Sequence, residues 1–295
     1  MKKFNEIFID KTKYGEKIQT SEYEKQGKHI IVDQGQAEIA GYTNREEGLF
    51  NEVPVIIFGD HTRLIKYIDE PFFLGADGVK VLRSKEKNAN YKYLYYALKS
   101  AKIPNTGYNR HFKWLKDVEI NYPDSVKQEK IVDILDRVSD VIEKRKAELS
   151  YLDTLIKARF VEMFGDPIYN THNRPTTEFI NVVKMQRGFD LPVQDRQQDG
   201  AVPVYGSNGA LDCHDVAKIQ GGGVITGRSG TIGKVFYTEG DYWPLNTSLF
   251  SVDTHGNNVI YLAYLLELYD LTRFVEGTGV PTLNRNMFHT KQIID

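Results

Sequence analysis

The chain has 295 residues, of which 41% are hydrophobic and 26% charged, and a formal net charge of -2. This composition is that of a globular protein long enough for two domains. The near-neutral charge excludes strong non-specific attraction to nucleic acid, so any DNA binding would have to rest on local patches. The single cysteine, Cys213, excludes an intramolecular disulfide. Because the start MKKFNEIFID lacks a signal-peptide run and no stretch of about 18 apolar residues occurs, we expect a cytoplasmic protein without a membrane span.

Residues 1–122 predict a mixed α/β domain. Short apolar runs rich in β-branched residues favour strands at 29–33, 53–58 and 79–82. A helical pattern follows at 91–99, where apolar and aromatic residues recur every three or four positions. We therefore expect strands first and a helix after them.

The longest uninterrupted helical pattern in the chain covers residues 125–165. Pro123 precedes it, Ser125 with Gln128 three positions on fits a capping box, and Gly165 predicts its end. About 40 residues at about 1.5 Å each give a rod of roughly 60 Å. The pattern has no internal glycine or proline, which favours one continuous helix.

Apolar residues on this helix recur at alternating steps of four and three, with Arg145 and Arg159 at two of the seam positions, which is the spacing of a coiled-coil seam. Three further apolar residues, Ile134, Val141 and Leu155, widen the stripe beside the seam. The pattern predicts that the helix pairs with a second helix, and burial in an ordinary globular core is the alternative. The seam residues are Ile131, Leu135, Val138, Ile142, Leu149, Leu152 and Ile156.

The segment after the helix repeats the order of the first domain. VIIFGDHTRLIKY corresponds to VITGRSGTIGKVF, and NANYKYLYYAL to GNNVIYLAYLL, at a spacing of 168 to 174 positions. Few aligned residues are identical, so a chance likeness of strand and helix patterning is the alternative. The pattern predicts a mixed α+β fold with two similar domains, at 1–122 and 167–295, joined by a coiled-coil-forming helix at 123–166.

The second copy stops at Asp295, at the point where the first copy continues into the long helix. A second helix of this kind is therefore expected but missing from the chain. We expect either a truncated form or a long helix that finds its partner on another molecule through self-association.

The glycine-rich run GGGVITGRSGTIGKVF does not match a phosphate-binding P-loop. A P-loop needs four residues between its glycines and Ser or Thr after its lysine, whereas five separate Gly227 from Gly233 and Val235 follows the lysine. The run instead predicts a strand ending at Thr226, a tight turn and a second strand from Ile232. Such a hairpin exposes groups that suit DNA phosphates and base edges, although a plain solvated turn fits the pattern too. These groups are Arg228, Ser229, Thr231 and Lys234.

Further polar groups lie in the equivalent loop of the first half and near the end of each half. Asn can read adenine and Arg guanine through paired hydrogen bonds. The Asn- and Arg-rich segments equally suit turns and helix caps, and the sequence leaves both interpretations open. The candidates are His61, Arg63 and Lys66 in the first loop, Asn109, Arg110 and Lys113 at the end of the first half, and Asn284, Arg285 and Asn286 at the end of the second.

Catalytic and metal-binding motifs are not intact in this sequence. A methyltransferase needs an Asn/Asp-Pro-Pro-aromatic motif and a glycine-rich cofactor loop, and the run NYP does not supply the first. The acids Asp124 and Glu129 fall in a helical context that would not place both on one metal ion. Cys213, His214 and Asp215 have no second ligand cluster to support them. We expect a non-catalytic protein with no cofactor or metal of its own.

Four segments are specific enough to indicate a family: QEKIVDIL and LDTLIKARFVEMFGDP in the long helix, and GRSGTIGK and GTGVPTLNR in the region that follows it. With these segments in this order, the whole chain resembles the specificity (S) subunit of type I restriction-modification enzymes. The resemblance implies two target-recognition domains that each read half of a split DNA sequence. It also implies that the subunit itself has no catalytic activity.

The resemblance implies partners as well. These are double-stranded DNA, methyltransferase (M) subunits that carry S-adenosylmethionine, and restriction (R) subunits. The missing second helix departs from the family pattern, because the intramolecular antiparallel coiled coil cannot form without it. A coiled-coil interaction protein whose two modules bind proteins or sugars is the alternative function, and the weakly acidic charge balance favours it.

Overall fold

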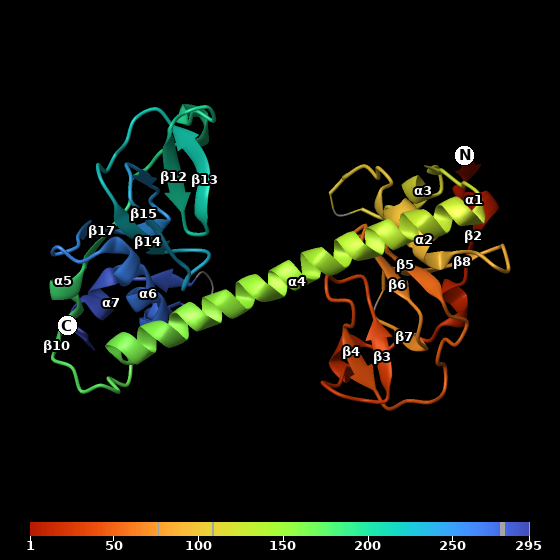
Figure 1. Cartoon of the computed structure of the whole chain (residues 1–295), viewed down its shortest axis with the longest axis horizontal. Helices are drawn as coiled ribbons and strands as arrows, with labels where there is room; N and C mark the ends of the chain where they lie inside the picture. Colours follow the sequence, from red (N-terminus) through yellow and green to blue (C-terminus); the bar gives the residue numbers. More distant parts are fainter. Residues whose placement is uncertain (76, 108, 278–280, 295) are drawn as a thin grey trace. The chain divides into compact units, whose positions relative to one another are not determined.

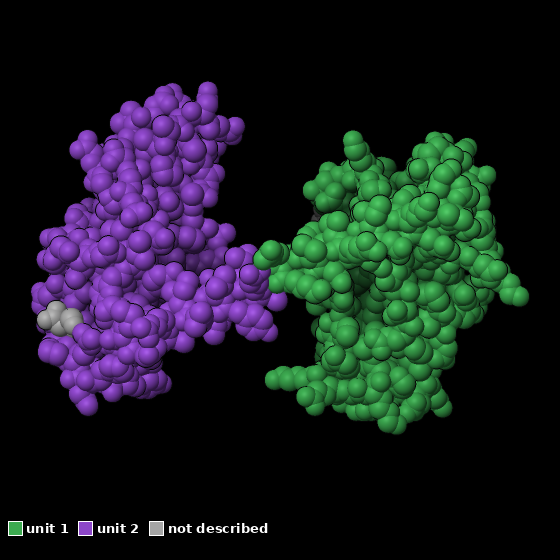
Figure 2. Space-filling view, in the orientation of Figure 1, with its two compact units in different colours: residues 1–146 green, residues 147–295 purple. Residues whose placement is uncertain are grey.

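The structure, a computed structural model, describes residues 1–75, 77–107, 109–277 and 281–294. It divides into two compact units, Met1–Lys146 (unit 1) and Ala147–Asp295 (unit 2), which Figure 2 shows in green and purple. Each unit contains a four-stranded sheet and a three-stranded sheet with short helices around them. The mixed α+β class predicted from the sequence is confirmed.

Unit 1 is built on an antiparallel sheet in the order β2-β8-β5-β6 and on a smaller sheet in the order β4-β3-β7, in which β3 and β7 run parallel (Figure 1). Strand β1 pairs with β9. The bounds are β1 Lys2–Lys3, α1 Phe4–Ile7, β2 Phe8–Asp10, β3 His29–Val32, β4 Gly41–Thr43, β5 Val55–Gly59, β6 Ile65–Ile68, β7 Phe72–Leu74, β8 Val79–Ser84, α2 Tyr91–Lys99, α3 Phe112–Leu115 and β9 Glu119–Ile120.

Unit 2 has its main sheet in the order β11-β17-β14-β15 and its smaller sheet in the order β13-β12-β16, with β12 and β16 parallel. Strand β10 pairs with β20, and β18 with β19. The bounds are β10 Thr176–Glu178, α5 Phe179–Val182, β11 Lys184–Arg187, β12 Val202–Gly206, β13 Gly209–His214, β14 Gly223–Gly227, β15 Val235–Thr238, β16 Trp243–Pro244, β17 Ser248–Asp253, α6 Val259–Tyr269, β18 Val275–Glu276, β19 Thr282–Leu283, α7 Arg285–His289 and β20 Gln292–Ile294.

The two units share one topology, which confirms the predicted duplication. The strands of the main sheet correspond in order, β2-β8-β5-β6 to β11-β17-β14-β15, and so do those of the smaller sheet. The parallel pair recurs at the same place, as β3 with β7 and β12 with β16. Few residues are identical between the halves, so the shared pattern of strands, helices and buried positions specifies the fold.

Strand β5 lies between two hydrophobic cores of unit 1. Its side chains alternate between the faces of the sheet: Ile56 and Phe58 belong to the core that contains α2, and Val55 and Ile57 to the core that contains β3 and β7. This explains why the sequence of β5 is a continuous apolar run. Strand β14 is buried along its whole length in the same way in unit 2.

The helix after the strands is capped by asparagine in both units. Asn90 Oδ1 accepts the N–H of Tyr93 at 2.9 Å, and Asn258 Oδ1 accepts the N–H of Ile260 at 2.8 Å. Helix α2 begins and ends at the predicted residues, Tyr91 to Lys99. A periodic apolar face and a good cap therefore define this helix from local sequence alone.

The predicted strands differ from the observed ones by up to two residues at their ends, and the glycine-rich hairpin differs more. Strand β14 ends at Gly227 and β15 begins only at Val235, so the expected tight turn is instead a longer loop, residues 228–234. A Cβ at Gly227 would lie 1.7 Å from Thr231 O. Glycine is therefore required here because the loop folds back over the strand end.

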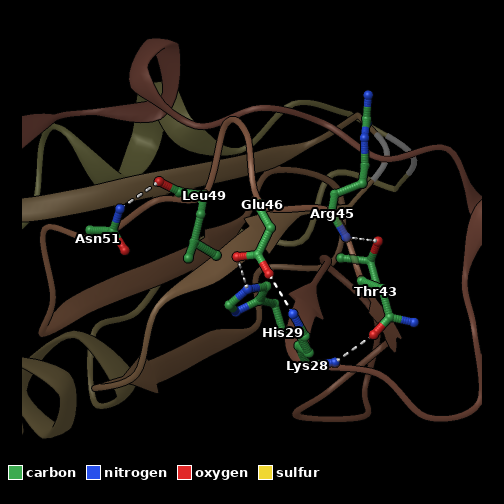
Figure 3. A network of polar contacts seen from close by, with 8 residues as sticks. Lys28, His29, Thr43, Arg45, Glu46, Leu49 and Asn51 are labelled. Carbon is green, nitrogen blue, oxygen red and sulfur yellow. Dashed lines mark hydrogen bonds and ion pairs between the residues drawn. The ribbon is translucent and has the colours of Figure 1, made fainter.

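A polar network fixes the segment that follows β4 in unit 1 (Figure 3). Glu46 pairs with Lys28 Nζ at 2.7 Å and lies 3.2 Å from His29 Nε2. The Arg45 N–H donates to Thr43 Oγ1 at 3.2 Å. The Lys28 hydrogen bond lowers the pKa of Glu46, which keeps the carboxylate ionised. Because the pair is exposed, it positions the loop and contributes little to stability.

Helix α4 spans Ser125–Phe164 without interruption, which confirms the predicted long helix. Its cap differs from the prediction: Asp124 Oδ1 accepts the N–H of Lys127 at 3.0 Å, and Ser125 is already the first helical residue. Gly165 ends the helix with φ of 86°, a left-handed conformation that glycine adopts without steric cost.

The two ends of α4 pack on helices of their own units. In unit 1, Asp136 accepts a hydrogen bond from the Tyr96 hydroxyl at 2.6 Å. In unit 2, the Phe160 ring stacks on Tyr261 with centroids 5.4 Å apart and lies 4.8 Å from Phe164. The later seam residues are 40% to 63% exposed: Val138, Ile142, Leu149, Leu152 and Ile156.

Replacing Phe160 by Ala is expected to destabilise unit 2 by about 3 kcal/mol, because a buried phenyl ring loses its contacts and leaves a cavity. Urea unfolding of the full chain measures the change. The matched control is Tyr151→Ala on the exposed face of the same helix, which should cost less than about 0.5 kcal/mol. Equal losses in the two variants would contradict the packing of Phe160.

His289 should make the stability of unit 2 depend on pH. It is buried, and its Nε2 accepts the N–H of Met185 at 3.1 Å, so the folded state holds the neutral ring. Burial, aided by Arg285 and Lys184, lowers its pKa from the ordinary 6.5. Since the unfolded chain binds this proton more readily, the contribution to stability is complete above pH 6.5 and is lost as the pH falls towards the lowered pKa.

Thermal unfolding at about pH 7.5 and about pH 5.5 measures this effect. The wild-type chain should lose more of its melting temperature on acidification than His289→Gln, whose side-chain carbonyl can still accept the Met185 N–H but does not titrate. The same loss in both proteins would show that His289 does not couple folding to pH.

Candidate nucleic-acid interface

Several loops meet at the end of β5 in unit 1. The N–H of Asp60 donates to Gly78 O at 2.7 Å, and Asp60 O accepts the N–H of His111 at 2.7 Å. Gln34, just after β3, accepts the His61 N–H at 3.0 Å through its side chain and the Thr62 hydroxyl at 2.7 Å through its backbone. The β3–β4 connection, the β5–β6 turn and the segment before α3 are therefore tied together.

The same loops meet at the end of β14 in unit 2. The N–H of Arg228 donates to Thr247 O at 2.9 Å, and Arg228 O accepts the N–H of Leu283 at 2.8 Å. Lys234 Nζ donates to Asn208 Oδ1 at 2.9 Å, which joins the β12–β13 turn to the loop. Arg228 thus makes the same two kinds of backbone bond as Asp60, one to the residue before β17 and one to the segment that leads into α7, so each unit presents a corresponding group of loops.

The predicted residues of the first loop lie on the β5–β6 turn. His61 and Arg63 are half-buried and Thr62 is exposed. Arg63 has φ of 62°, and its guanidinium lies 3.4 Å from Ile103 O. A non-glycine residue in this left-handed conformation costs free energy, so the surrounding contacts must hold the turn in place.

Lys66 is placed differently from its neighbours, because it is buried. Only 7% of it is exposed, and its Nζ donates to Asp33 O at 2.8 Å and to Ala37 O at 2.6 Å. Burial lowers its pKa, against the opposing effect of Asp33. Lys66 therefore holds the β3–β4 connection from inside and does not reach the surface.

The predicted residues at the end of the first half are exposed. Asn109 Nδ2 donates to Thr106 O at 2.5 Å, and Arg110 follows it at the surface. Lys113 lies on α3, with its Nζ 4.1 Å from the centre of the Trp114 ring. The structure brings Asn109 and Arg110 to the His61–Arg63 turn through the bond between His111 and Asp60.

In unit 2, Arg228, Ser229 and Thr231 are half-buried in the loop after β14 and Lys234 is exposed. Ser229 also forms a backbone bridge with Thr282, which brings the loop to the segment before α7. This contact joins the predicted residues of the loop after β14 to those at the start of α7. The contact at Asp60 joins the corresponding residues in unit 1.

Asn284 is the N-cap of α7, and its Oδ1 accepts the N–H of Asn286 at 3.1 Å. Its side chain is thus used by the helix, as the turn-and-cap interpretation predicts. Arg285 is half-buried on the first turn, and Asn286 is exposed beside it. Residues 278–280 of the segment GTGVPTLNR lie outside the described residues.

Sequence reasoning missed Gln34 as a part of this interface, and it placed Asp60 and His111 in the candidate loops without predicting that they are buried and paired. The repeat offers a signal for Gln34, since DQG in the first half aligns with SNG in the second and Asn208 holds the equivalent position. Asp60 and His111 fall within the two candidate loop segments of the first half, but their pairing links positions far apart in the chain. Only the folded chain makes that pair visible.

The described residues give little support for a metal site or a membrane-spanning helix. Within them, no group of three or more His, Cys, Asp or Glu side chains is arranged to hold a metal ion. His214, a weak metal candidate, packs its ring against Trp243 with centroids 5.3 Å apart. Among all the residues that the structure describes, no helix is long and apolar enough to cross a membrane.

Comparison with known proteins adds to this geometry. A 133-residue segment is 29% identical to the Escherichia coli type I restriction enzyme EcoR124I/EcoR124II specificity subunit, and it covers 41% of this chain and 33% of that relative. The match thus spans about a third of the relative's length.

The crystal structure of the type I restriction-modification S subunit from M. genitalium aligns with a TM-score of 0.59 at 17% identity, over 99% of this chain and 83% of that one, and so shares the fold. The model of the type I restriction modification DNA specificity domain matches residues 1–151 and 175–294. With both halves of the chain matched, this protein belongs to the family of type I restriction-modification DNA specificity domains.

Proposed function

We propose that this chain is the non-catalytic DNA sequence-specificity subunit of a type I restriction-modification system and that it recognises a bipartite target. The observation that carries the proposal is the duplicated interface, in which each unit ties equivalent loops to the end of its central strand. Family membership supports DNA as the ligand and does not favour an interaction protein with other ligands. One half of the target is assigned to domain 1–122, the other to domain 167–295, with 123–166 as the helical spacer.

Equivalent loops with different side chains would let one fold read two different half-sites. The turn after β5 offers His61 and Arg63, whereas the loop after β14 offers Arg228, Ser229 and Thr231. Lys66 and Asn284 are assigned to holding these loops, since their polar groups are used internally. The proposed DNA contacts are His61, Arg63, Asn109, Arg110 and Lys113 in unit 1, and Arg228, Ser229, Thr231, Lys234, Arg285 and Asn286 in unit 2.

The proposed partners follow from this assignment. Methyltransferase (M) subunits would carry S-adenosylmethionine and modify the bound DNA, and restriction (R) subunits would join them in the complete enzyme. This chain would act in the cytoplasm. Its net charge of -2 implies that partner subunits supply much of the positive surface needed to hold the phosphate backbone.

The double change Arg228→Ala and Arg285→Ala should weaken base preference at the unit 2 half-site by about 10-fold, because one bidentate arginine contact discriminates by about 1–3 kcal/mol. Mapping methylated sites in a host that carries the complete enzyme measures the preference at both half-sites. The unit 1 half-site should not change.

The control for charge is Lys184→Ala with Lys291→Ala, which removes two exposed cations of unit 2 outside the loops. It should leave the methylated sequence unchanged. If the arginine variant folds and still methylates the same sites as the wild type, the arginines do not read DNA.

We also propose that α4 pairs with a helix of a second molecule. Its seam residues between the two ends are exposed, and a row of large apolar side chains on one face loses free energy to water until it is covered. Self-association of two copies through this seam would provide the cover.

Replacing Val138 and Leu149 by Glu should therefore shift the purified chain from dimer towards monomer, because two charges would enter the apolar seam. Sedimentation equilibrium measures the change. The control is Ala147→Glu, which lies roughly 160° around the helix from Leu149 and is exposed. A wild-type chain that stays monomeric at high concentration would rule out this pairing.

A further inference from the structure

Unit 1 buries a polar pair that the proposed DNA contacts do not include. Asp60 is 3% exposed and His111 is fully buried. Buried polar groups cost free energy unless they are hydrogen-bonded, so such a pair is retained where its bonds hold something in place. Both residues lie directly beneath the surface loops that carry the candidate DNA contacts.

Asp60 holds the start of α3 with its backbone and its side chain. Its carbonyl oxygen accepts the N–H of His111 at 2.7 Å and lies 3.0 Å from the Nδ1 of the same residue. Its Oδ1 accepts the N–H of Phe112 at 2.8 Å. Three contacts on one residue leave the β5–β6 turn and the start of α3 little freedom to move apart.

The contacts of His111 continue outward to the surface. Because a carbonyl oxygen only accepts, Nδ1 carries the proton, and in the neutral ring Nε2 is then an acceptor. Nε2 lies 3.4 Å from the hydroxyl of Thr106, which therefore donates to it. The oxygens of Thr106 in turn accept from Asn109 Nδ2, the carbonyl at 2.5 Å and the hydroxyl at 3.2 Å.

This path fixes the orientation of an exposed amide. With Nδ2 held by Thr106, the Oδ1 of Asn109 is the amide atom directed away from Thr106. An oriented carbonyl oxygen accepts from an exocyclic amino group, which adenine or cytosine presents in the major groove. Arg110 lies between Asn109 and the buried His111, so its backbone is fixed by the same contacts.

Unit 2 lacks the side-chain part of this path. Its Arg228 and Leu283 make the corresponding backbone bond at 2.8 Å, but neither supplies an imidazole. The path therefore adds to a frame that both units share. Unit 2 therefore serves as an internal control for any change made to the path in unit 1.

Building on the proposed function, we infer that Asp60 and His111 are positioning residues that set the base preference of unit 1, by fixing Asn109 and Arg110 through Thr106. They do not touch DNA themselves. The half-site of unit 1 is read in part by the Asn109 carbonyl, from an amino group of adenine or cytosine.

His111→Phe tests this inference in the full chain together with its methyltransferase subunit. Phenylalanine keeps an aromatic ring against Trp114, which lies 5.3 Å from the imidazole, but removes both ring nitrogens. Selection from a pool of randomised DNA duplexes, followed by sequencing, reports the preference at both half-sites in one experiment. Preference at the unit 1 half-site should fall by about 10-fold, while the unit 2 half-site and the affinity for random duplex stay unchanged.

Thr106→Val is the second variant, because Thr106 is exposed and valine keeps its shape without the hydroxyl. It leaves the pairing of Asp60 with His111 intact, so it tests the outer link even if His111→Phe fails to fold. It too should relax the unit 1 half-site alone, with an unchanged melting temperature.

The outcomes separate this inference from the proposed function. A wild-type complex that selects no sequence would overturn the proposed function. A wild-type complex that selects two half-sites, with folded Thr106→Val selecting the same two at the same strength, would overturn the positioning role only. Equal loss at both half-sites in either variant would also overturn it, since a general loss of binding is not a loss of positioning.

Discussion

Burial of one strand on both of its faces is the constraint on which each unit depends. Strand β5 places alternate side chains in two cores, and β14 is buried in the same way. The hydrophobic effect therefore fixes the position of this strand. Side-chain packing fixes its register, because a slip by one residue would exchange the side chains that fill the two cores. Its end is therefore a fixed place from which a loop can start.

The candidate interface uses that rigid end in a consistent way. Main-chain bonds at Asp60 and Arg228 tie equivalent loops together in the two units. Since backbone groups are the same at every position, these ties do not depend on which side chains the loops carry. A fold built like this can keep its frame and change its surface chemistry, which suits the proposed reading of two different half-sites.

The two units differ in how far side chains reinforce the frame. Unit 1 adds the Asp60–His111 pair and the buried Lys66, whereas unit 2 relies on Gly227 and a longer loop whose Lys234 contacts Asn208. In the positioning role inferred above, the first arrangement holds Asn109 in one orientation before binding. Oriented groups lose less entropy on binding.

By itself, the sequence determined the elements whose signals are local or periodic. The long helix α4, the bounds of α2 and the duplicated order of strands follow from spacing, caps and apolar pattern. The family was indicated by the resemblance of four sequence segments. The roles of the loop residues could be predicted only in part. Lys66 and Asn284 have the residue types of DNA contacts, but in the fold their side chains form hydrogen bonds within the protein. The tertiary structure alone decided these roles and the pairing of Asp60 with His111, because burial and hydrogen bonds between residues distant in the chain exist only once the loops are brought together.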